Sequence, residues 1–249
     1  MITIEALTAA AREAGSIMLE ATDIQSGVEA KEGRANFVTA YDKKVQEFLY
    51  GRLTELLPEA AFVGEEEETH AALGHGYAFI VDPIDGTTNF MKGAGCSAVS
   101  IGLLLDGEPY MAAVYNPYRD EMFWAQRGKG AYCGKQRIFV SKKPLSDGLV
   151  LFGTAPYYRE LADKSFEMAK SYFDRSLDVR RSGSAALDLC SVASGRAELF
   201  FELRLQPWDF AAGALLISEA GGRITTVDGE PLRFDRPQSV LAVGDDSCG

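Results

Sequence analysis

The chain has 249 residues, of which 47% are hydrophobic and 24% are charged, an ordinary globular composition that allows a substantial core. Twenty-five Lys and Arg stand against 36 Asp and Glu, which gives a formal net charge of −11. This balance argues against a nucleic-acid-binding protein, because such proteins bind through a basic surface. The same field would repel an anionic substrate, so a substrate of that kind would need a bound cation beside it.

The first twenty residues predict a helix, because apolar side chains recur at helical spacing from Ile4 to Met18. Glu5 and Glu13 interrupt the apolar pattern, so the segment is neither a signal peptide nor a membrane span. The chain has four widely separated cysteines and no CxxC pair, which favours reduced, buried thiols over a disulfide framework. We therefore expect a cytoplasmic protein with no membrane partner. The cysteines are Cys96, Cys133, Cys190 and Cys248.

A second helix is predicted to begin after Thr39, which has an acid, Asp42, three positions further on, in the pattern of a helix N-cap. Apolar residues from Val45 to Leu56 then repeat at helical spacing, and Pro58 closes the segment. The stretch between the two helices, SGVEAKEGRANF (26–37), is polar and contains glycine, so we expect a loop there.

From residue 77 the pattern predicts strands separated by turn residues, in an antiparallel meander. The expected strands are YAFIV (77–81), SAVSIGLLL (97–105), YMAAVYNP (110–117) and EMFWAQ (121–126). After residue 145 strands and helices alternate again. The expected elements are strand 149–153, a helix around 161–173, strand 177–182, a helix 185–193 ended by Gly195, strand 197–203 and a helix 210–220 ended by Gly221 and Gly222.

These elements indicate an α+β protein built in layers. We expect a single domain over residues 1–249, with a soft division near residue 145 into an N-terminal α+β half (1–145) and a C-terminal α/β half (146–249).

The stretch DPIDGTTNF (82–90) places Asp82 and Asp85 on one tight turn, and residues 64–91 contain six acids but no Lys or Arg. Two carboxylates about 4 Å apart repel each other by roughly 4 kcal/mol at an effective dielectric constant of about 20. Either one of them is protonated or a cation lies between them. Ligands that are all oxygen favour a hard cation such as Mg²⁺, and the only histidines, His70 and His75, form no zinc-like pattern with cysteine.

The residues after these acids, Gly86, Thr87 and Thr88, could hold a phosphate through their backbone N–H groups. Metal on one side and amides on the other are typical of phosphoryl transfer. Each feature also has a simpler interpretation when it is taken alone. DPIDG could be a turn that ends a strand, GEEEE (64–68) a solvated acidic run, and Asp209 an acid that stabilises a helix start.

Taken in order, GEE, DPIDGTTNF and WDFAAGALLISEAGG (208–222) resemble the inositol monophosphatase family of Mg²⁺-dependent, lithium-sensitive phosphatases. The similarity extends over most of the chain, including RGKGAYCGKQ (127–136). It implies a layered α-β-α-β-α sandwich of the inositol monophosphatase and fructose-1,6-bisphosphatase type, and a homodimer. It also implies two or three Mg²⁺ ions, with Mn²⁺ as a substitute and Ca²⁺ and Li⁺ as inhibitors.

The resemblance further implies the roles of individual residues. The metal ligands would be Glu65, Asp82, the backbone carbonyl of Ile84, Asp85 and Asp209. The Thr87 hydroxyl, oriented by Asp42, would help Glu65 to activate water. The residues that bind substrate would be Gly86, Thr87, Gly183, Ser184, Ala185 and Glu202. Without the resemblance, Glu202 reads as an exposed acid at the end of a strand.

The expected function is metal-dependent hydrolysis of a small phosphorylated polyol or sugar, with an inositol monophosphate as the first expectation. The motif DPIDGTTNF favours the branch of the family that acts on inositol and sugar phosphates. Asn36, in contrast, stands where many members carry Asp, and Gln206 lies in a stretch that varies among family members, so both leave the choice of substrate open. The same chemistry on fructose 1,6-bisphosphate, histidinol phosphate or a dinucleotide phosphate is one alternative. A regulatory or scaffold partner that keeps the fold is an alternative of another class.

Overall fold

The computed structural model describes residues 2–22, 28–30, 37–67 and 73–244. Asn36, His70, Cys248 and much of the predicted loop 26–37 lie outside the described residues. Two of the predicted buried thiols, Cys96 and Cys133, are only half-buried, whereas Cys190 is buried. None of the helices among the described residues is both long enough and apolar enough to cross a membrane.

The larger sheet has seven strands in the order β3-β4-β5-β6-β7-β8-β9. All neighbours are antiparallel except β3 and β4, which confirms the meander from β4 onward. The strands are β3 (Ala61–Gly64), β4 (Tyr77–Asp85), β5 (Ala98–Leu105), β6 (Glu108–Asn116), β7 (Glu121–Gln126), β8 (Gly130–Cys133) and β9 (Gln136–Ile138). The sequence did not predict β3, which is short and lies parallel to its only neighbour.

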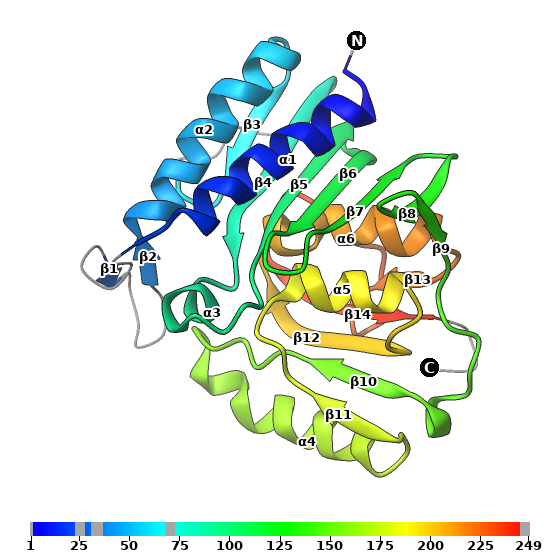
Figure 1. The fold of residues 1–249 in the computed structure, drawn as a ribbon. Coiled ribbons are helices and arrows are strands. Elements are labelled where there is room, and N and C mark those ends of the chain that lie inside the picture. Colours follow the sequence, from blue (N-terminus) through cyan, green and yellow to red (C-terminus); the bar gives the residue numbers. More distant parts are fainter. Residues whose placement is uncertain (1, 23–27, 31–36, 68–72, 245–249) are drawn as a thin grey trace.

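Two helices, α1 (Ile4–Leu19) and α2 (Ala40–Leu56), cover one face of this sheet (Figure 1). The predicted N-cap of α2 is confirmed as a capping box, in which Thr39 and Asp42 hydrogen-bond each other's backbone. The apolar stripes of both helices meet the sheet in one cluster, which includes Leu7, Leu49 and Ile101. Burial of these stripes explains why both helices form where their periodicity places them.

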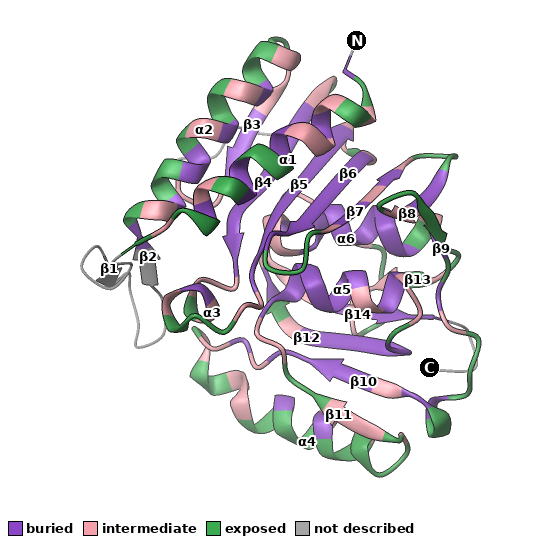
Figure 2. Cartoon of the chain, in the orientation of Figure 1, coloured by how far each residue is buried: buried purple, intermediate pink, exposed green. Residues whose placement is uncertain are grey.

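The other face of the larger sheet carries α5 (Ala185–Ala193) and α6 (Pro207–Glu219). These two helices are buried on nearly all sides, because a second sheet lies beyond them (Figure 2). Small residues allow the close approach: a Cβ added to Gly102 of β5 would lie 3.0 Å from the Cβ of Ala211 in α6. Helix α6 begins three residues earlier than predicted, because Pro207 suits the first turn of a helix.

The second sheet has five strands in the order β11-β10-β12-β14-β13. Strands β11, β10 and β12 are parallel, and β14 is antiparallel to β12 and β13. Helix α4 (Ala162–Phe173) covers its outer face over a separate cluster that includes Val150 and Phe201. The strands are β10 (Leu149–Phe152), β11 (Asp178–Arg180), β12 (Leu199–Leu205), β13 (Arg223–Thr225) and β14 (Gln238–Val243).

The predicted α-β-α-β-α layering is therefore confirmed (Figure 1). Outside these layers are the paired strands β1 (Val28–Ala30) and β2 (Phe37–Thr39), the short helix α3 (Thr87–Lys92), and the 3₁₀ turns η2 (Leu145–Asp147) and η3 (Arg159–Leu161). The division near residue 145 stays a prediction. The apolar cluster between the sheets contains residues from both sides of it.

Candidate active site

The first two acids of the site lie at an irregularity of β4. Asp82 pairs with Ser100 and Asp85 with Ala98, so three steps along β4 match two steps along β5. In a regular strand, residues three apart point to opposite faces, and the extra residue of a β-bulge corrects this. Both carboxylates can therefore face the same cavity, while the side chain of Ile84 between them is fully buried in the core on the α1 and α2 side.

A third acid comes from the first turn of α6, where Asp209 Oδ2 accepts a hydrogen bond from the backbone N–H of Gln206 at 2.7 Å. One carboxylate oxygen each from Asp82, Asp85 and Asp209 lie within 4.8 Å of one another. Asp85 Oδ2 also accepts hydrogen bonds from the Ser184 hydroxyl and, at 3.0 Å, from the N–H of Ala186. The cluster thus joins β4 to the starts of both central helices.

Burial makes this cluster electrostatically costly. Burial first, and then the neighbouring acids, raise the pKa of Asp82 and of Asp209 well above the ordinary value. Burial also raises the pKa of Asp85 to about 6, although its hydrogen bonds from Ser184 and Ala186 oppose the rise. Three converging carboxylates of this kind must take up protons or a cation near neutral pH. Their all-oxygen donor set fits a hard divalent cation such as Mg²⁺.

Glu65, which follows β3, lines the same cavity, and its charge raises the pKa of Asp82. Its backbone N–H donates to the carbonyl of Val81 at 3.1 Å, which fixes it beside β4. The next residue, Glu66, is not among the residues that line the cavity: its backbone N–H donates to Gln46 Oε1 at 2.8 Å, and its charge raises the pKa of Asp42. The structure therefore places Glu65, and not Glu66, in the cavity wall.

Thr87 connects the acid cluster to α2. Its hydroxyl lies 3.1 Å from Asp42 Oδ1 and 3.2 Å from the carbonyl oxygen of Ile84, and it can donate to either. Asp42 is almost fully buried, and burial raises its pKa although hydrogen bonds from Thr39 and Thr87 oppose the rise. The capping box that starts α2 thus also positions a carboxylate behind the Thr87 hydroxyl.

Gly86 turns the chain from β4 into α3 in the left-handed region, at φ +84°. A Cβ at this position would lie 3.1 Å from the carbonyl oxygens of Cys96 and Gly183, so both the conformation and the space favour glycine. Gly86, Thr87 and Thr88 all line the cavity, which has a volume of about 260 Å³.

The predicted substrate segment Gly183, Ser184 and Ala185 lines the same cavity beside the acid cluster, where the Ser184 hydroxyl bonds to Asp85. Glu202 lies there too, but the interpretation of it as an exposed strand-end acid is wrong. It is within β12, is only 7% exposed, and accepts a hydrogen bond from the N–H of Ala155 at 2.8 Å. Burial raises its pKa to about 7, against the opposing effects of this hydrogen bond and of Arg181.

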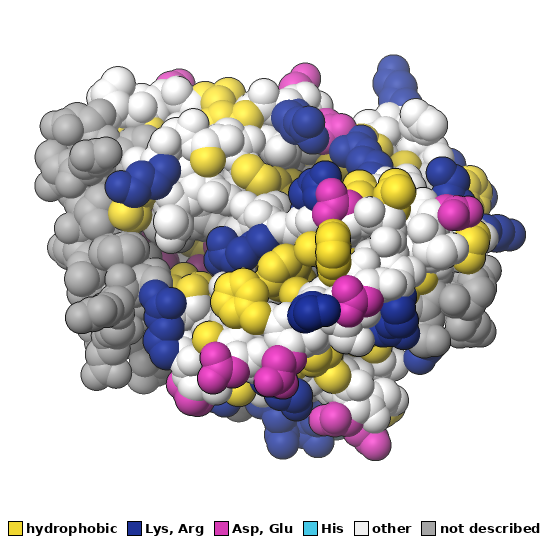
Figure 3. Space-filling view, turned by 90° about the horizontal axis from the view of Figure 1, so that it is seen from below, with side chains coloured by type: hydrophobic (Ala, Val, Ile, Leu, Met, Phe, Trp, Pro, Cys, Tyr) yellow, Lys and Arg dark blue, Asp and Glu magenta, His cyan; other side chains and the backbone are white. Residues whose placement is uncertain are grey.

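The sequence did not predict several residues of the cavity. Arg181, Arg204, Tyr157 and Asp188 all line it. Residues 64–91 contain no Lys or Arg, but the fold brings two arginines of the C-terminal half, Arg181 and Arg204, into the lining of the same cavity as these acids. The face of the molecule that carries α4 is hollowed near its centre, with Lys or Arg and hydrophobic side chains around the hollow (Figure 3).

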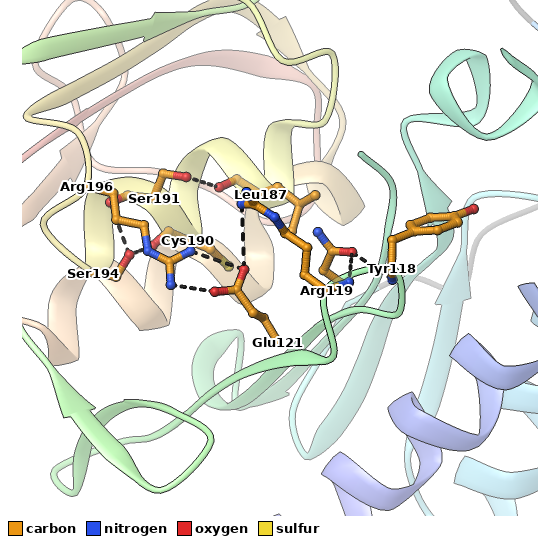
Figure 4. A network of polar contacts seen from close by, with 9 residues as sticks. Tyr118, Arg119, Glu121, Leu187, Cys190, Ser191, Ser194 and Arg196 are labelled. Atoms are coloured by element: carbon orange, nitrogen blue, oxygen red, sulfur yellow. Dashed lines mark hydrogen bonds and ion pairs between the residues drawn. The ribbon is translucent and has the colours of Figure 1, made fainter. Parts of the chain in front are cut away.

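A second cavity of about 400 Å³ lies behind Asp188, which lines both. It is also lined by Glu121 of β7, whose carboxylate binds the guanidinium of Arg196 at 2.5 and 3.1 Å and lies 3.9 Å from that of Arg119 (Figure 4). Arg196 follows α5, so this ion pair ties the larger sheet to the helix whose N-cap, Ser184, bonds to Asp85.

Comparison with known proteins agrees with this arrangement. A profile of the inositol monophosphatase family matches residues 2–247. The putative Nus factor SuhB of Neisseria meningitidis serogroup B is 39% identical over 223 residues, 89% of this chain and 85% of that protein. The inositol-1-monophosphatase of Caulobacter vibrioides is 38% identical over 246 residues, 98% of this chain and 95% of that protein.

Among solved structures, inositol monophosphatase II of Staphylococcus aureus bound to inositol monophosphate superimposes with a TM-score of 0.82 at 30% identity. The match covers 97% of this chain and 89% of that one. Since both the family profile and relatives above 30% identity span nearly the whole chain, the chain belongs to the inositol monophosphatase family.

Proposed function

We propose that the protein hydrolyses a small phosphate monoester, with an inositol monophosphate as the first candidate, in a Mg²⁺-dependent reaction. The observation that carries this proposal is the convergence of Asp82, Asp85 and Asp209, all held by backbone or hydroxyl hydrogen bonds beside the Gly86 turn. Their raised pKa values support a cation as the group that balances them. The name of the Caulobacter relative and the ligand of the Staphylococcus structure support the substrate class.

Glu65, Asp82, Asp85, Asp209 and the carbonyl of Ile84 would hold the cations, two or three in number. Bound Mg²⁺ would supply charge neutralisation at the phosphate and would acidify the attacking water. The backbone N–H groups of Gly86 and Thr87 would orient the phosphate. These assignments rest on the donor set of the cavity and on the family to which the chain belongs.

The chain's own groups would then manage the proton of the water. Because the Thr87 hydroxyl can donate to Asp42 Oδ1, its lone pairs are free to accept a hydrogen bond from a water in the cavity. Asp42, with its raised pKa, would take the proton that Thr87 passes on. Glu65, which lines the cavity beside Asp82, would act as the second base.

Substrate hydroxyl groups would meet the wall formed by Gly183, Ser184, Ala185 and Glu202. Glu202 Oε1 already accepts the N–H of Ala155, which fixes the carboxylate and leaves its other oxygen for a ring hydroxyl. Its pKa of about 7 means that both protonation states are accessible near neutral pH, so it can accept or donate.

A panel of phosphate monoesters with released phosphate as the readout tests the proposal. It should contain inositol monophosphates, fructose 1,6-bisphosphate, histidinol phosphate and a dinucleotide phosphate. We expect turnover with Mg²⁺ or Mn²⁺, none after metal stripping in EDTA, and inhibition by millimolar Li⁺ or Ca²⁺. Full turnover in EDTA would contradict the mechanism, and indifference to both inhibitory ions would contradict the family's metal chemistry in this chain.

A second candidate function is that of a regulatory or scaffold partner, and the name Nus factor of the Neisseria relative favours it. The two functions can be separated in cells that lack the gene. The Asp209→Asn variant lacks a proposed metal ligand. If it restores the wild-type phenotype to these cells, they need the protein as a regulatory or scaffold partner. Failure of a folded Asp209→Asn protein to restore it would assign the requirement to hydrolysis.

We also propose a cytoplasmic homodimer. The exposed aromatic side chains Phe166 and Phe173 of α4 and the neighbouring Leu177, which is 67% exposed, are compatible with an association surface. Sedimentation equilibrium at several protein concentrations tests the stoichiometry, and a monomer at all of them would contradict it.

A further inference from the structure

Three parallel strands of the second sheet end at one edge of the cavity. Strand β11 leads into Arg181, β10 leads into the segment 153–158, and β12 carries Glu202 and Arg204 near its end. The carboxyl ends of parallel strands meet at the same edge of a sheet, which is where open α/β sheets bind ligands. The wall opposite the acid cluster is therefore assembled from these three strand ends.

Both arginines are anchored to the segment that follows β10. Arg181 Nε donates to Thr154 Oγ1 at 3.1 Å, and the Arg204 guanidinium lies 4.3 Å from the centre of the Tyr158 ring. A guanidinium held over an aromatic ring keeps its N–H groups in the plane above the ring, where they can bind an anion with two hydrogen bonds. Within the ranges described for this chain, neither arginine forms an ion pair, although both are exposed at the cavity.

These two cations stand against six acids in the lining of the cavity, namely Glu65, Asp82, Asp85, Asp188, Glu202 and Asp209. The charge of Arg181 lowers the pKa of Glu202 and of Asp188, whereas burial and neighbouring acids raise the pKa of Asp82. The scissile phosphate would be held by the metal acids and the Gly86 turn on the other wall. The arginines thus face the part of the substrate that leaves.

We infer that the leaving group of the substrate carries a second anionic group, a phosphate or a carboxylate, and that Arg181 and Arg204 bind it. This inference rests on the proposed phosphatase function but changes the order of its candidate substrates: it places phosphorylated sugars or polyols with two acidic groups ahead of an inositol monophosphate, whose leaving group is uncharged. An uncharged cyclitol would satisfy Glu202 but would offer no anion to either guanidinium group.

Two matched pairs of substrates test it: fructose 1-phosphate with fructose 1,6-bisphosphate, and glucose 6-phosphate with 6-phosphogluconate. The readout is the ratio of kcat/KM within each pair, with Mg²⁺ present. We expect a ratio above one for the member with two anionic groups in at least one pair. Since charge-assisted hydrogen bonds at an exposed site are of moderate strength, Arg204→Gln and Arg181→Gln should each lower that ratio roughly five- to tenfold. The pair that responds identifies phosphate or carboxylate as the second group.

Arg175→Gln is the matched control. Arg175 is also exposed and lies 4.9 Å from the centre of the Tyr172 ring, but it lines neither cavity. We expect it to leave the ratio unchanged. Arg204→Lys keeps the charge without the planar fork, and should give an intermediate ratio. Ratios at or below one in both pairs, or an equal fall of the ratio in Arg175→Gln, would overturn the inference.

If the wild-type protein releases phosphate from no member of either pair, the phosphatase proposal fails. The proposed anion-binding role of Arg181 and Arg204 is then tested by measuring how tightly the same compounds bind. Isothermal titration calorimetry in Ca²⁺ then compares glucose 6-phosphate with 6-phosphogluconate, and fructose 1-phosphate with fructose 1,6-bisphosphate. Tighter binding of a two-anion ligand that is lost in the Arg181→Gln, Arg204→Gln double variant would support the anion subsite. Equal binding within both pairs would overturn it.

Discussion

The carboxylate of Glu202 in β12 fills the space that a side chain on residue 153 would occupy, since a Cβ built on Gly153 would overlap it. Gly153 directly follows β10, the parallel neighbour of β12. A buried acid therefore reaches the cavity edge only because its neighbour has no side chain. The Ala155 N–H that binds this carboxylate belongs to the same segment, and Ala155 adopts the left-handed region at φ +42°.

Replacement of this glycine should therefore be destabilising. We expect Gly153→Ala to lower the free energy of unfolding by about 1–3 kcal/mol, because the methyl group forces the carboxylate to move. In the Glu202→Ala background the same change should cost at least about 1 kcal/mol less, which urea unfolding measures as a double-mutant cycle. Gly51→Ala is the control: this exposed position in α2 has nothing within 4 Å, so the change should stabilise the helix. Additive effects at 153 and 202 would refute the contact.

The raised pKa of Glu202 predicts a pH dependence of stability. Its carboxyl group titrates near 4.5 when unfolded and at about 7 when folded, so between these values the folded state binds one proton more. Stability must then fall as pH rises through this window, by about 2–3 kcal/mol for this group. Glu202→Gln, which can still accept the N–H of Ala155, should remove that part of the decline. Urea unfolding at pH 5 and pH 8 in EDTA measures it, and parallel declines in both proteins would be the contrary result.

Relief of repulsion in the acid cluster should be visible without substrate. In EDTA, we expect Asp209→Asn to raise the free energy of unfolding by about 1 kcal/mol, because one buried carboxylate is removed while the bond to Gln206 can persist. The rise in melting temperature that Mg²⁺ produces in the wild-type protein should shrink, and turnover should be lost. Asp163→Asn changes another first-turn aspartate, in α4, and should keep the full response to Mg²⁺. An unchanged response in Asp209→Asn would exclude Asp209 as a ligand.

The acidic run after β3 offers a test with two adjacent residues. Glu65 lines the cavity and Glu66 does not, so Glu65→Gln should lower kcat about a hundredfold or more, whereas Glu66→Gln should have a much smaller effect. Steady-state kinetics at saturating Mg²⁺ measures both. The reverse order of effects would show that Glu66, and not Glu65, binds the metal and acts as the base.

The hydroxyl of Thr87 should matter more than its methyl group. Thr87→Ser keeps the contacts to Asp42 and to the carbonyl of Ile84, and should retain most of kcat. Thr87→Val has the same shape without the hydroxyl and should lose about a hundredfold, with a changed pH profile of kcat, since proton transfer through Asp42 is interrupted. Equal rates in both variants would remove Thr87 from the proton path.

The sequence predicted the parts of the site that are encoded by consecutive residues. The acids of DPIDGTTNF, the Thr39 and Asp42 capping box, and the start of α6 near Asp209 are local patterns, and the structure has each of them. The layered α+β class was predictable for the same reason, because the helical stripes and the meander are periodic along the chain, whereas the order of the layers was implied by the family resemblance.

The strand-end wall could not be predicted, because its residues meet only through the pairing of β10 with β11 and β12. The resemblance assigned their neighbours Gly183 and Glu202 to the substrate, but it gave no role to Arg181 or Arg204, and each lies outside the three family motifs. Glu202 was misread in one interpretation as exposed, since its burial depends on Gly153, which follows the neighbouring strand β10. The parallel placement of β3 was missed for a similar reason, as parallel pairing leaves no local turn signal.

The bulge in β4 and the ends of β10, β11 and β12 belong to different sheets, and no residue is common to both. A change of preferred substrate therefore need not disturb the hydrolytic machinery. An engineer who randomises only residues 154, 157, 158, 181 and 204 would alter one wall of the cavity while the acids proposed to hold the cation keep their backbone and their hydrogen bonds. If the proposed function holds, directed evolution toward new phosphate esters should therefore begin at the strand ends of the second sheet.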